Sequence, residues 1–204
     1  MTTLFPMFVK LAGRKCLVVG AGPLAESKVE DLLHSGARVH VVAPDATPQI
    51  QAWASEARIA WEQRVFAPAD LDGASLVIAA TSSDDVNQAV FDHAEARGIF
   101  CNAIDQPERC HFYFPAVVRR GQLQIAISSG GLSPSLAHRL RVDLEQQFGP
   151  EYEVWLEWLG AVRKLVLQRQ KDPAKRKRLL ARFASRRSLD SFLRSTRKRR
   201  GGVS

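Results

Sequence analysis

The chain has few cysteines and no long apolar run. Its three cysteines include no CxxC pair, so they cannot form the disulfide framework of a small secreted protein. No segment approaches the roughly 18 consecutive apolar residues of a membrane-spanning helix. The N-terminus MTTLFPMFVKLAGRK also lacks the basic start, apolar core and small-residue cleavage site of a secretory signal. We therefore expect a cytoplasmic protein without a membrane partner.

Composition and length fit a globular protein. Apolar residues make up 46% of the 204 residues and charged residues 25%, which excludes disordered and collagen-like chains. The length allows one large domain or two small ones. The net charge of +8 is uneven, because residues 171–204 hold 13 Lys and Arg against two Asp, while the remainder is mildly acidic. Binding of nucleic acid by the whole chain is therefore not indicated.

The first hundred residues alternate short β-branched runs with amphipathic stretches, a pattern typical of a parallel sheet with crossover helices. Apolar spacing predicts one helix in PLAESKVEDLLH, ended by Gly36, and another over about 83–97, capped by Ser82 or Ser83. Strands are expected at 15–19, 38–42, 59–62, 76–80 and 100–103. The predicted fold class is α/β, with a Rossmann-like sheet.

A different pattern follows Asp105. Two apolar runs, YFPAVV and LQIAI, flank the turn residues RRGQ and predict a hairpin outside the parallel sheet. Ser133 and Pro134 then begin a helix, and the remainder is helical in pattern up to a C-terminal end, 197–204, that we expect to be disordered. We predict three parts: a nucleotide-binding domain over 1–112, a dimerisation and substrate-site segment over 113–149, and a helical domain with a basic tail over 150–204.

The turn VVGAGPLA has the G-x-G-x-x-A arrangement of dinucleotide-binding proteins. Gly20 permits the tight turn from strand to helix, Gly22 lets the backbone approach a pyrophosphate, and Ala25 is small enough for helix and strand to touch. Pro23 and Leu24 begin the helix whose N-terminus would face the anion. A glycine turn can also be a plain connection, but the flanking strand and helix favour nucleotide binding.

The acidic residue that usually binds the adenosine ribose is missing from its expected place. The second strand ends in VHVVAPD, so Asp45 comes late, and we expect Pro44 and Asp45 to form the wall on the adenosine side. NAD is favoured over NADP because that loop has no arginine for a 2′-phosphate. Thr81 and Ser82 follow the fourth strand and would lie beside the cofactor, although Ser82 could equally cap the next helix.

Five segments in this order and spacing resemble the precorrin-2 dehydrogenase family, the dehydrogenase and ferrochelatase module of siroheme synthase. They are FPMFVKLAGRKCLVVGAG with PLAESK, then VVAPD, IAATSSDDVNQAV, CNAIDQPERCHFYFPAVV and ISSGGLSPSLAHRLR, across about residues 4–147. The resemblance is to the stand-alone form, without a methyltransferase domain. It implies NAD-dependent oxidation of precorrin-2 to sirohydrochlorin, and in some members insertion of Fe²⁺ to give siroheme.

The resemblance also implies residue roles. Asp105 matches the family's active aspartate, and it follows the fifth strand, where doubly wound sheets place functional groups. A carboxylate there could accept a proton from the substrate or guide a metal ion. The alternative is that Asp105 only caps the turn Asp-Gln-Pro.

A second anion site is expected just before the helix at Pro134. Exposed backbone N–H groups followed by a helix N-terminus suit the carboxylates of a tetrapyrrole. Ser129 matches a serine at the edge of the family's active site. The substrate-binding candidates are Ser128, Ser129, Gly130 and Gly131. A plain connecting turn remains the alternative.

Neither a resident metal site nor a nucleic-acid partner is favoured. Cys110 and His111 are adjacent and lack metal-ligand spacing, so burial or a substrate contact is expected instead. The apolar face with Trp155 and Trp158 suggests a homodimer. The competing hypotheses are an NAD-binding regulator that contacts nucleic acid through the basic tail, and a chelatase that has lost its dehydrogenase activity.

Overall fold

The computed structural model describes residues 3–200, with side chains up to Arg194, and it divides into two compact units, Met1–Phe114 and Pro115–Ser204. Among the helices of residues 3–200, none combines the length and the hydrophobicity of a membrane span. Residues 201–204 of the tail expected to be disordered lie outside the described residues. Residues 197–200 belong to helix α7, so the expectation was wrong for them.

The first unit contains a five-stranded sheet in which every neighbouring pair is parallel. The strand order is β3-β2-β1-β4-β5, which is the Rossmann order, and this confirms the predicted fold class. The direction of winding reverses between β1 and β4, and ligands of such sheets bind outside the carboxyl ends at this point. The strands are β1 (Lys15–Val19), β2 (Arg38–Val42), β3 (Ala60–Glu62), β4 (Ala74–Ala79) and β5 (Phe100–Ala103).

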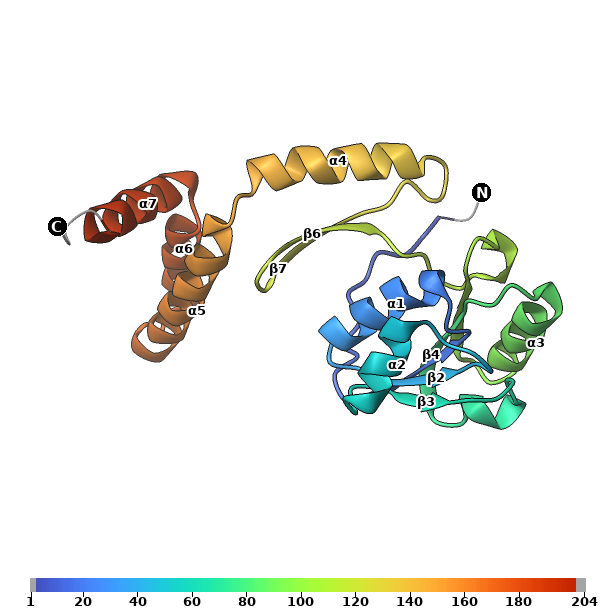
Figure 1. Cartoon of the computed structure of the whole chain (residues 1–204). Coiled ribbons are helices and arrows are strands. Elements are labelled where there is room, and N and C mark those ends of the chain that lie inside the picture. Colours follow the sequence, from blue (N-terminus) through green and yellow to red (C-terminus); the bar gives the residue numbers. More distant parts are fainter. Residues whose placement is uncertain (1–2, 201–204) are drawn as a thin grey trace. The chain divides into compact units, whose positions relative to one another are not determined.

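Helices cover both faces of this sheet (Figure 1). Helices α1 (Pro23–His34) and α2 (Pro48–Ser55) pack on one face, whereas α3 (Asp84–Glu95) and the 3-10 turn Pro68–Leu71 pack on the other. In β1, Cys16 and Val18 join the first core and Leu17 and Val19 the second, because successive side chains of a strand alternate between faces. Burial on both faces explains why the strand is apolar at nearly every position.

Helix α2 was not predicted from the sequence. It is only eight residues long, and Thr47 caps it by accepting a hydrogen bond from the N–H of Ile50. Ile50 and Trp53 are its buried residues, and one such pair is too short a pattern to identify a helix. A second short element, the 3-10 turn Pro107–Arg109, follows β5.

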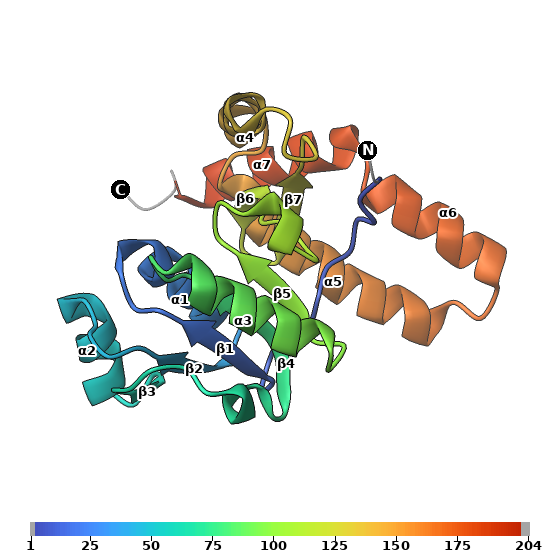
Figure 2. The same cartoon turned by 90° about the vertical axis from the view of Figure 1, so that its right-hand side faces the viewer.

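Over residues 115–200, the second unit contains a hairpin and four helices. Strands β6 (Ala116–Arg120) and β7 (Leu123–Ile127) are antiparallel, as predicted. Helix α4 (Pro134–Gln147) begins at the predicted cap Ser133, whose Oγ accepts from the N–H of Leu136. Helices α5 (Glu151–Arg169) and α6 (Pro173–Phe183) lie side by side (Figure 2), and α7 (Arg186–Arg200) follows.

Candidate cofactor and active site

The glycine turn lies where β1 meets the end of β4. Gly20 has a φ of +103°, and a Cβ on it would lie 2.3 Å from the carbonyl oxygen of Ala80. Its N–H also donates to the carbonyl of Val42, at 2.9 Å, so the turn is tied to β2 as well. Both the conformation and the space therefore require glycine at this position.

Gly22 differs, because nothing lies within 4 Å of the Cβ that it would carry. It is the N-cap of α1 and is followed by Pro23 at the first helical position and Leu24, which is exposed. No side chain caps this helix. Pro23 has no N–H and the N–H of Ala25 donates to the Gly22 carbonyl at 3.0 Å, so among the first three helical residues the N–H of Leu24 is the one left for a ligand. Ala25 is fully buried against the sheet. An open approach and an uncapped N-terminus fit the pyrophosphate of a dinucleotide.

The loop after β2 forms a wall beside the glycine turn. The N–H of Thr47 donates to the carbonyl of Ala21 at 3.1 Å, and the indole N–H of Trp61 donates to the carbonyl of Ala43 at 3.1 Å. Pro44 and Asp45 lie in this loop and are exposed. The loop expected on the adenosine side is therefore held at the same edge of the sheet as Gly22.

An arginine that sequence reasoning missed follows β3, the strand next to β2. The guanidinium of Arg64 binds Glu62 at 2.6 Å and Asp70 at 2.6 Å. These hydrogen bonds lower the pKa of the Asp70 carboxyl, so the pair stays ionised at neutral pH. Since both carboxylates already hold this guanidinium, it is not a free receptor for a 2′-phosphate.

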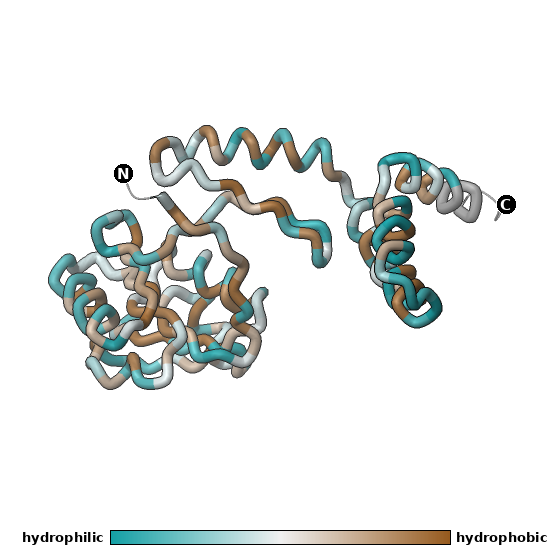
Figure 3. Tube along the Cα trace, turned by 180° about the vertical axis from the view of Figure 1, so that it is seen from behind, coloured by the Kyte–Doolittle hydropathy of each residue, from teal (hydrophilic) through white to brown (hydrophobic). Residues whose placement is uncertain are grey.

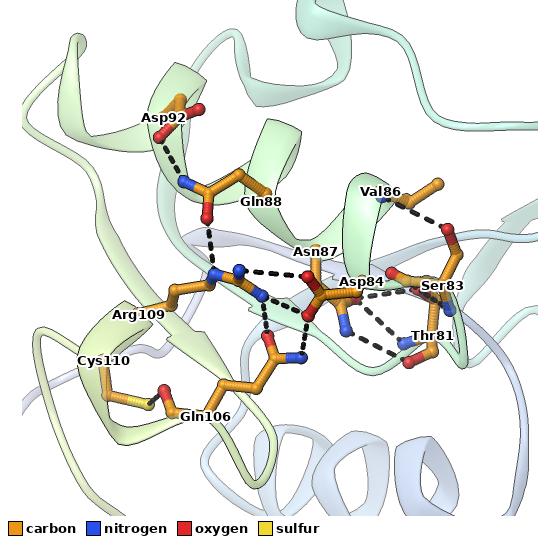
Figure 4. A network of polar contacts seen from close by, with 10 residues as sticks. All are labelled: Thr81, Ser83, Asp84, Val86, Asn87, Gln88, Asp92, Gln106, Arg109 and Cys110. Atoms are coloured by element: carbon orange, nitrogen blue, oxygen red, sulfur yellow. Dashed lines mark hydrogen bonds and ion pairs between the residues drawn. The ribbon is translucent and has the colours of Figure 1, made fainter.

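The loop after β4 is fixed by a buried amide (Figure 4). Asn87 is only 3% exposed; its Oδ1 accepts from the Thr81 hydroxyl at 2.8 Å and its Nδ2 donates to the Thr81 carbonyl at 3.1 Å. Ser83, not Ser82, caps α3, because its Oγ accepts from the N–H of Val86. Ser82 is exposed beside this fixed loop. The burial of Asn87 was not predicted from the sequence.

Asp105 lies in the loop after β5 with a φ of +61°, an unusual conformation for a residue with a side chain. The preceding N–H, of Ile104, donates to the carbonyl of Ala79 at 3.0 Å, which ties the loop to the end of β4. Asp105 is exposed, and within residues 3–194 no group donates a hydrogen bond to its carboxylate. No hydrogen bond among these residues therefore supports the alternative, in which Asp105 caps the Asp-Gln-Pro turn.

Cys110 and His111 hold this loop together. The Cys110 thiol faces the carbonyl oxygens of Ala103 and Gln106, each at 3.2 Å, and burial raises its pKa, so it remains a neutral donor. The Nδ1 of His111 accepts from the N–H of Cys101 at 3.0 Å. No group of three His, Cys, Asp or Glu suited to a metal ion occurs in the described part of the chain.

The serine and glycine segment belongs to the second unit. Gly130 and Gly131 have φ values of +63° and +82°. The Ser128 hydroxyl accepts from the N–H of Gly130, and the Ser129 hydroxyl accepts from the N–H of Ser133, both at 3.1 Å. The hydroxyls thus shape the turn and already occupy two of the N–H groups that an anion would need.

The candidate residues therefore fall into two groups. One set lies at the carboxyl edge of the sheet in the first unit: Gly20, Gly22, Pro23, Leu24, Pro44, Asp45, Thr81, Ser82 and Asp105. The other set, Ser128 to Gly131, precedes α4 in the second unit. The first set offers an anion-binding turn with an exposed carboxylate two strands away, which suits redox chemistry on a bound nucleotide.

Comparisons with known proteins agree with this arrangement. Residues 7–116 match the family model of putative NAD(P)-binding proteins, and residues 120–147 match that of the central segment of sirohaem biosynthesis proteins. Siroheme synthase 2 of Klebsiella pneumoniae is 48% identical over 140 residues, covering 69% of this chain and 31% of that protein. Siroheme synthase of Methylobacillus flagellatus is 44% identical over 164 residues, covering 80% of this chain and 35% of that protein.

This chain thus spans about a third of the length of these curated relatives. A solved structure described as SirC, precorrin-2 dehydrogenase, matches with a TM-score of 0.76 and 25% identity. That match covers 96% of this chain and 100% of the other. The similarity therefore includes both compact units.

Proposed function

Because this chain belongs to the putative NAD(P)-binding family and carries the central segment of sirohaem biosynthesis proteins, we propose that it is a precorrin-2 dehydrogenase. It oxidises precorrin-2 to sirohydrochlorin with NAD as the acceptor. The observation that carries the proposal is the structural match over the whole of a solved precorrin-2 dehydrogenase. The same match favours the enzyme over a regulator that binds nucleic acid.

The residues of the first unit fit the nucleotide. The uncapped start of α1 at Gly22, Pro23 and Leu24 would hold the pyrophosphate, and the loop with Pro44 and Asp45 would contact the adenosine. Thr81 and Ser82 would lie at the nicotinamide side. When bound, NAD supplies the acceptor for a hydride. NAD is proposed over NADP because the guanidinium of Arg64 is already bound by Glu62 and Asp70.

Asp105 is proposed as the general base. Oxidation removes a hydride and a proton from the macrocycle, and the proton needs an acceptor within hydrogen-bond reach. The Asp105 carboxylate is exposed and accepts no hydrogen bond from the described residues, so it is available to the substrate. Ser128, Ser129, Gly130 and Gly131 are proposed to bind substrate carboxylates, with the N–H groups that the two hydroxyls leave unused.

The test is a spectroscopic assay with precorrin-2 and NAD. Sirohydrochlorin and NADH should form in equal amounts, and Asp105→Asn should lower kcat by about 100-fold or more, as expected for loss of a general base. Glu108→Gln is the matched control, because Glu108 is an exposed acid in the same loop. Full turnover by Asp105→Asn would remove the aspartate from this role, and absence of NADH with the wild-type protein would refute the proposed activity.

Insertion of Fe²⁺ into sirohydrochlorin stays a prediction. Iron would be a substrate here, and the described residues contain no cluster that would retain it. The exposed Asp105 carboxylate could accept the pyrrole N–H protons that the metal displaces. Adding Fe²⁺ after the oxidation is complete separates the two steps. A siroheme spectrum would support chelation, and an unchanged sirohydrochlorin spectrum would assign it to another protein.

A homodimer formed through the second unit is also proposed. Only Val118, Ala137, Trp155 and Leu189 are buried apolar residues among those described in this unit. Helix α4 alternates hydrophilic and hydrophobic residues along its length (Figure 3), and Leu136 on it is 43% exposed. Exposed apolar surface of this kind indicates a protein interface.

Light scattering should therefore give twice the monomer mass of 22.6 kDa. Leu136→Glu should shift the population to monomer, whereas Val65→Glu, at an exposed apolar position of the first unit, should not. A wild-type protein that is monomeric at all accessible concentrations would contradict the proposal.

A further inference from the structure

An ion pair joins the start of α3 to the loop after β5 (Figure 4). Arg109, in the 3-10 turn that follows Asp105, binds the carboxylate of Asp84 with both terminal nitrogens of its guanidinium. The second contact, from Nη2 to Oδ2, measures 3.1 Å. The pair spans 25 residues of sequence, so it links two separate loops at the carboxyl edge of the sheet.

Two glutamines complete the network. The Nε of Arg109 donates to Oε1 of Gln88 at 2.6 Å, and its Nη1 donates to Oε1 of Gln106 at 2.8 Å. The amide of Gln106 in turn donates to Oδ1 of Asp84 at 2.8 Å. Only 15% of the Arg109 side chain is exposed. The planar guanidinium of Arg109 donates from Nε, Nη1 and Nη2, so it is held in one orientation and links the two loops rigidly.

The network connects the two loops that carry the proposed chemistry. Asp84 follows the Thr81–Ser83 loop directly, and Gln106 is the neighbour of Asp105. The left-handed conformation of Asp105, with a φ of +61°, is strained for a residue with a side chain and persists only where its surroundings impose it. Gln106 and Arg109 lie on the C-terminal side of this residue, whereas the bond from Ile104 to Ala79 restrains its N-terminal side.

We propose that Asp84 and Arg109 are positioning residues that hold the Asp105 carboxylate in line with the nicotinamide side of the sheet edge. The inference rests on the proposed dehydrogenase function. Its physical basis is alignment, since a displacement of about 1 Å between reacting groups can cost about 100-fold in rate. Neither residue is assigned contact with the reacting atoms.

If the pair only stabilised the fold, its loss would lower the melting temperature and kcat together. Asp84 is 68% exposed, and ion pairs of this kind contribute little to global stability. Loss of the pair should therefore change the local order of the loop and kcat more than it changes the melting temperature. Asp85→Asn is the matched control, because Asp85 is the next acid in the first turn of α3, is exposed and is not a partner of Arg109.

The experiment compares Asp84→Asn, Asp84→Glu, Arg109→Lys and Asp85→Asn in the full chain. Asp84→Asn should lower kcat by about 10- to 100-fold, with KM for NAD within about twofold of wild type. Asp84→Glu, which keeps the carboxylate, should recover most of that loss. Hydrogen–deuterium exchange without nucleotide or substrate should show faster exchange over 104–110 in Asp84→Asn and unchanged exchange in Asp85→Asn.

Each outcome decides the inference. Equal kcat and equal exchange in Asp84→Asn and Asp85→Asn would overturn it while leaving the dehydrogenase assignment intact. A loss of kcat that only matches the unfolded fraction would overturn it as well, and if Asp84→Asn does not fold, Arg109→Lys provides the same comparison. Absence of NADH formation by the wild-type protein would instead refute the proposed function, and the positioning role with it.

Discussion

Replacing Gly20 by alanine should lower the stability of the fold, whereas replacing Gly22 by alanine should lower the affinity for NAD. At Gly20 the φ of +103° places a side chain in a strained region, at about 1–3 kcal/mol. The new Cβ would also lie 2.3 Å from the Ala80 carbonyl oxygen, and forcing an atom into packed surroundings costs about 1–3 kcal/mol. We therefore expect Gly20→Ala to lower the free energy of unfolding by about 2–6 kcal/mol.

Gly22→Ala should leave stability nearly unchanged. Its φ is −82°, and no atom lies within 4 Å of the added Cβ. Alanine is a poorer N-cap than glycine by up to about 1 kcal/mol. Alanine also reduces the conformational entropy of the unfolded chain, which stabilises the folded state by about 0.4–1 kcal/mol and offsets this loss. The new methyl group would instead stand where the pyrophosphate approaches, so NAD affinity should fall at least about tenfold, or 1.4 kcal/mol.

Urea unfolding and isothermal titration with NAD measure the two effects separately. The reasoning would be refuted by a Gly20→Ala protein as stable as wild type. It would equally be refuted by a Gly22→Ala protein that binds NAD normally. The second result would also remove the pyrophosphate from the start of α1 while leaving the fold intact.

Three further predictions concern groups around the site. Asn87→Ala should lower the free energy of unfolding by about 1–3 kcal/mol, because the backbone N–H and carbonyl of Thr81 lose the hydrogen bonds that they make with Asn87. Urea titration tests this, and a change below about 0.5 kcal/mol would contradict it. The hydrogen bonds from Arg64 hold the pKa of Asp70 below its ordinary value of 3.8. The stability that this pair contributes is therefore complete above the pKa that Asp70 has in the unfolded chain, and it is lost as pH falls through the lower pKa of the folded protein. Asp70→Asn should therefore be less stable at pH 7 and lose less stability on acidification than wild type, and parallel pH profiles of the urea midpoint would argue against the pair. Finally, Cys110 should react with iodoacetamide at pH 7.5 at least about tenfold more slowly than free cysteine, since burial raises its pKa, and mass spectrometry of the labelled protein measures the rate.

Local signals identified most of the elements. Strand β1 and helix α1 appear where the β-branched run and the glycine turn place them, and Ser133 with Pro134 marks the start of α4. Each of these depends on residues within one or two turns of one another. Such short-range patterns also led to the parallel sheet and to the separate hairpin, because alternation of strands and helices determines the class of architecture.

The connections across the site had no comparable signal. Asn87 lies in α3 among residues of ordinary helical pattern, and it is buried where α3 meets the loop that carries Thr81. The pair of Arg109 and Asp84 is separated by 25 residues and depends on two loops meeting at one edge. Arg64 is bound by Glu62 and Asp70, two and six residues away, through an irregular loop that has no periodic pattern to read. Sequence pattern therefore located the candidate residues but not the groups that hold them.

The ends of the five-stranded sheet restrict how this molecule can aggregate. An unpaired strand is a template for another chain, and proteins limit this hazard by keeping such strands short or covering them. At one end β3 has only three residues, and at the other the backbone of Cys110 forms an antiparallel bridge to Asn102 in β5. Neither border offers a long run of free backbone groups, so misassembly by strand addition is suppressed in the nucleotide-binding part of the chain.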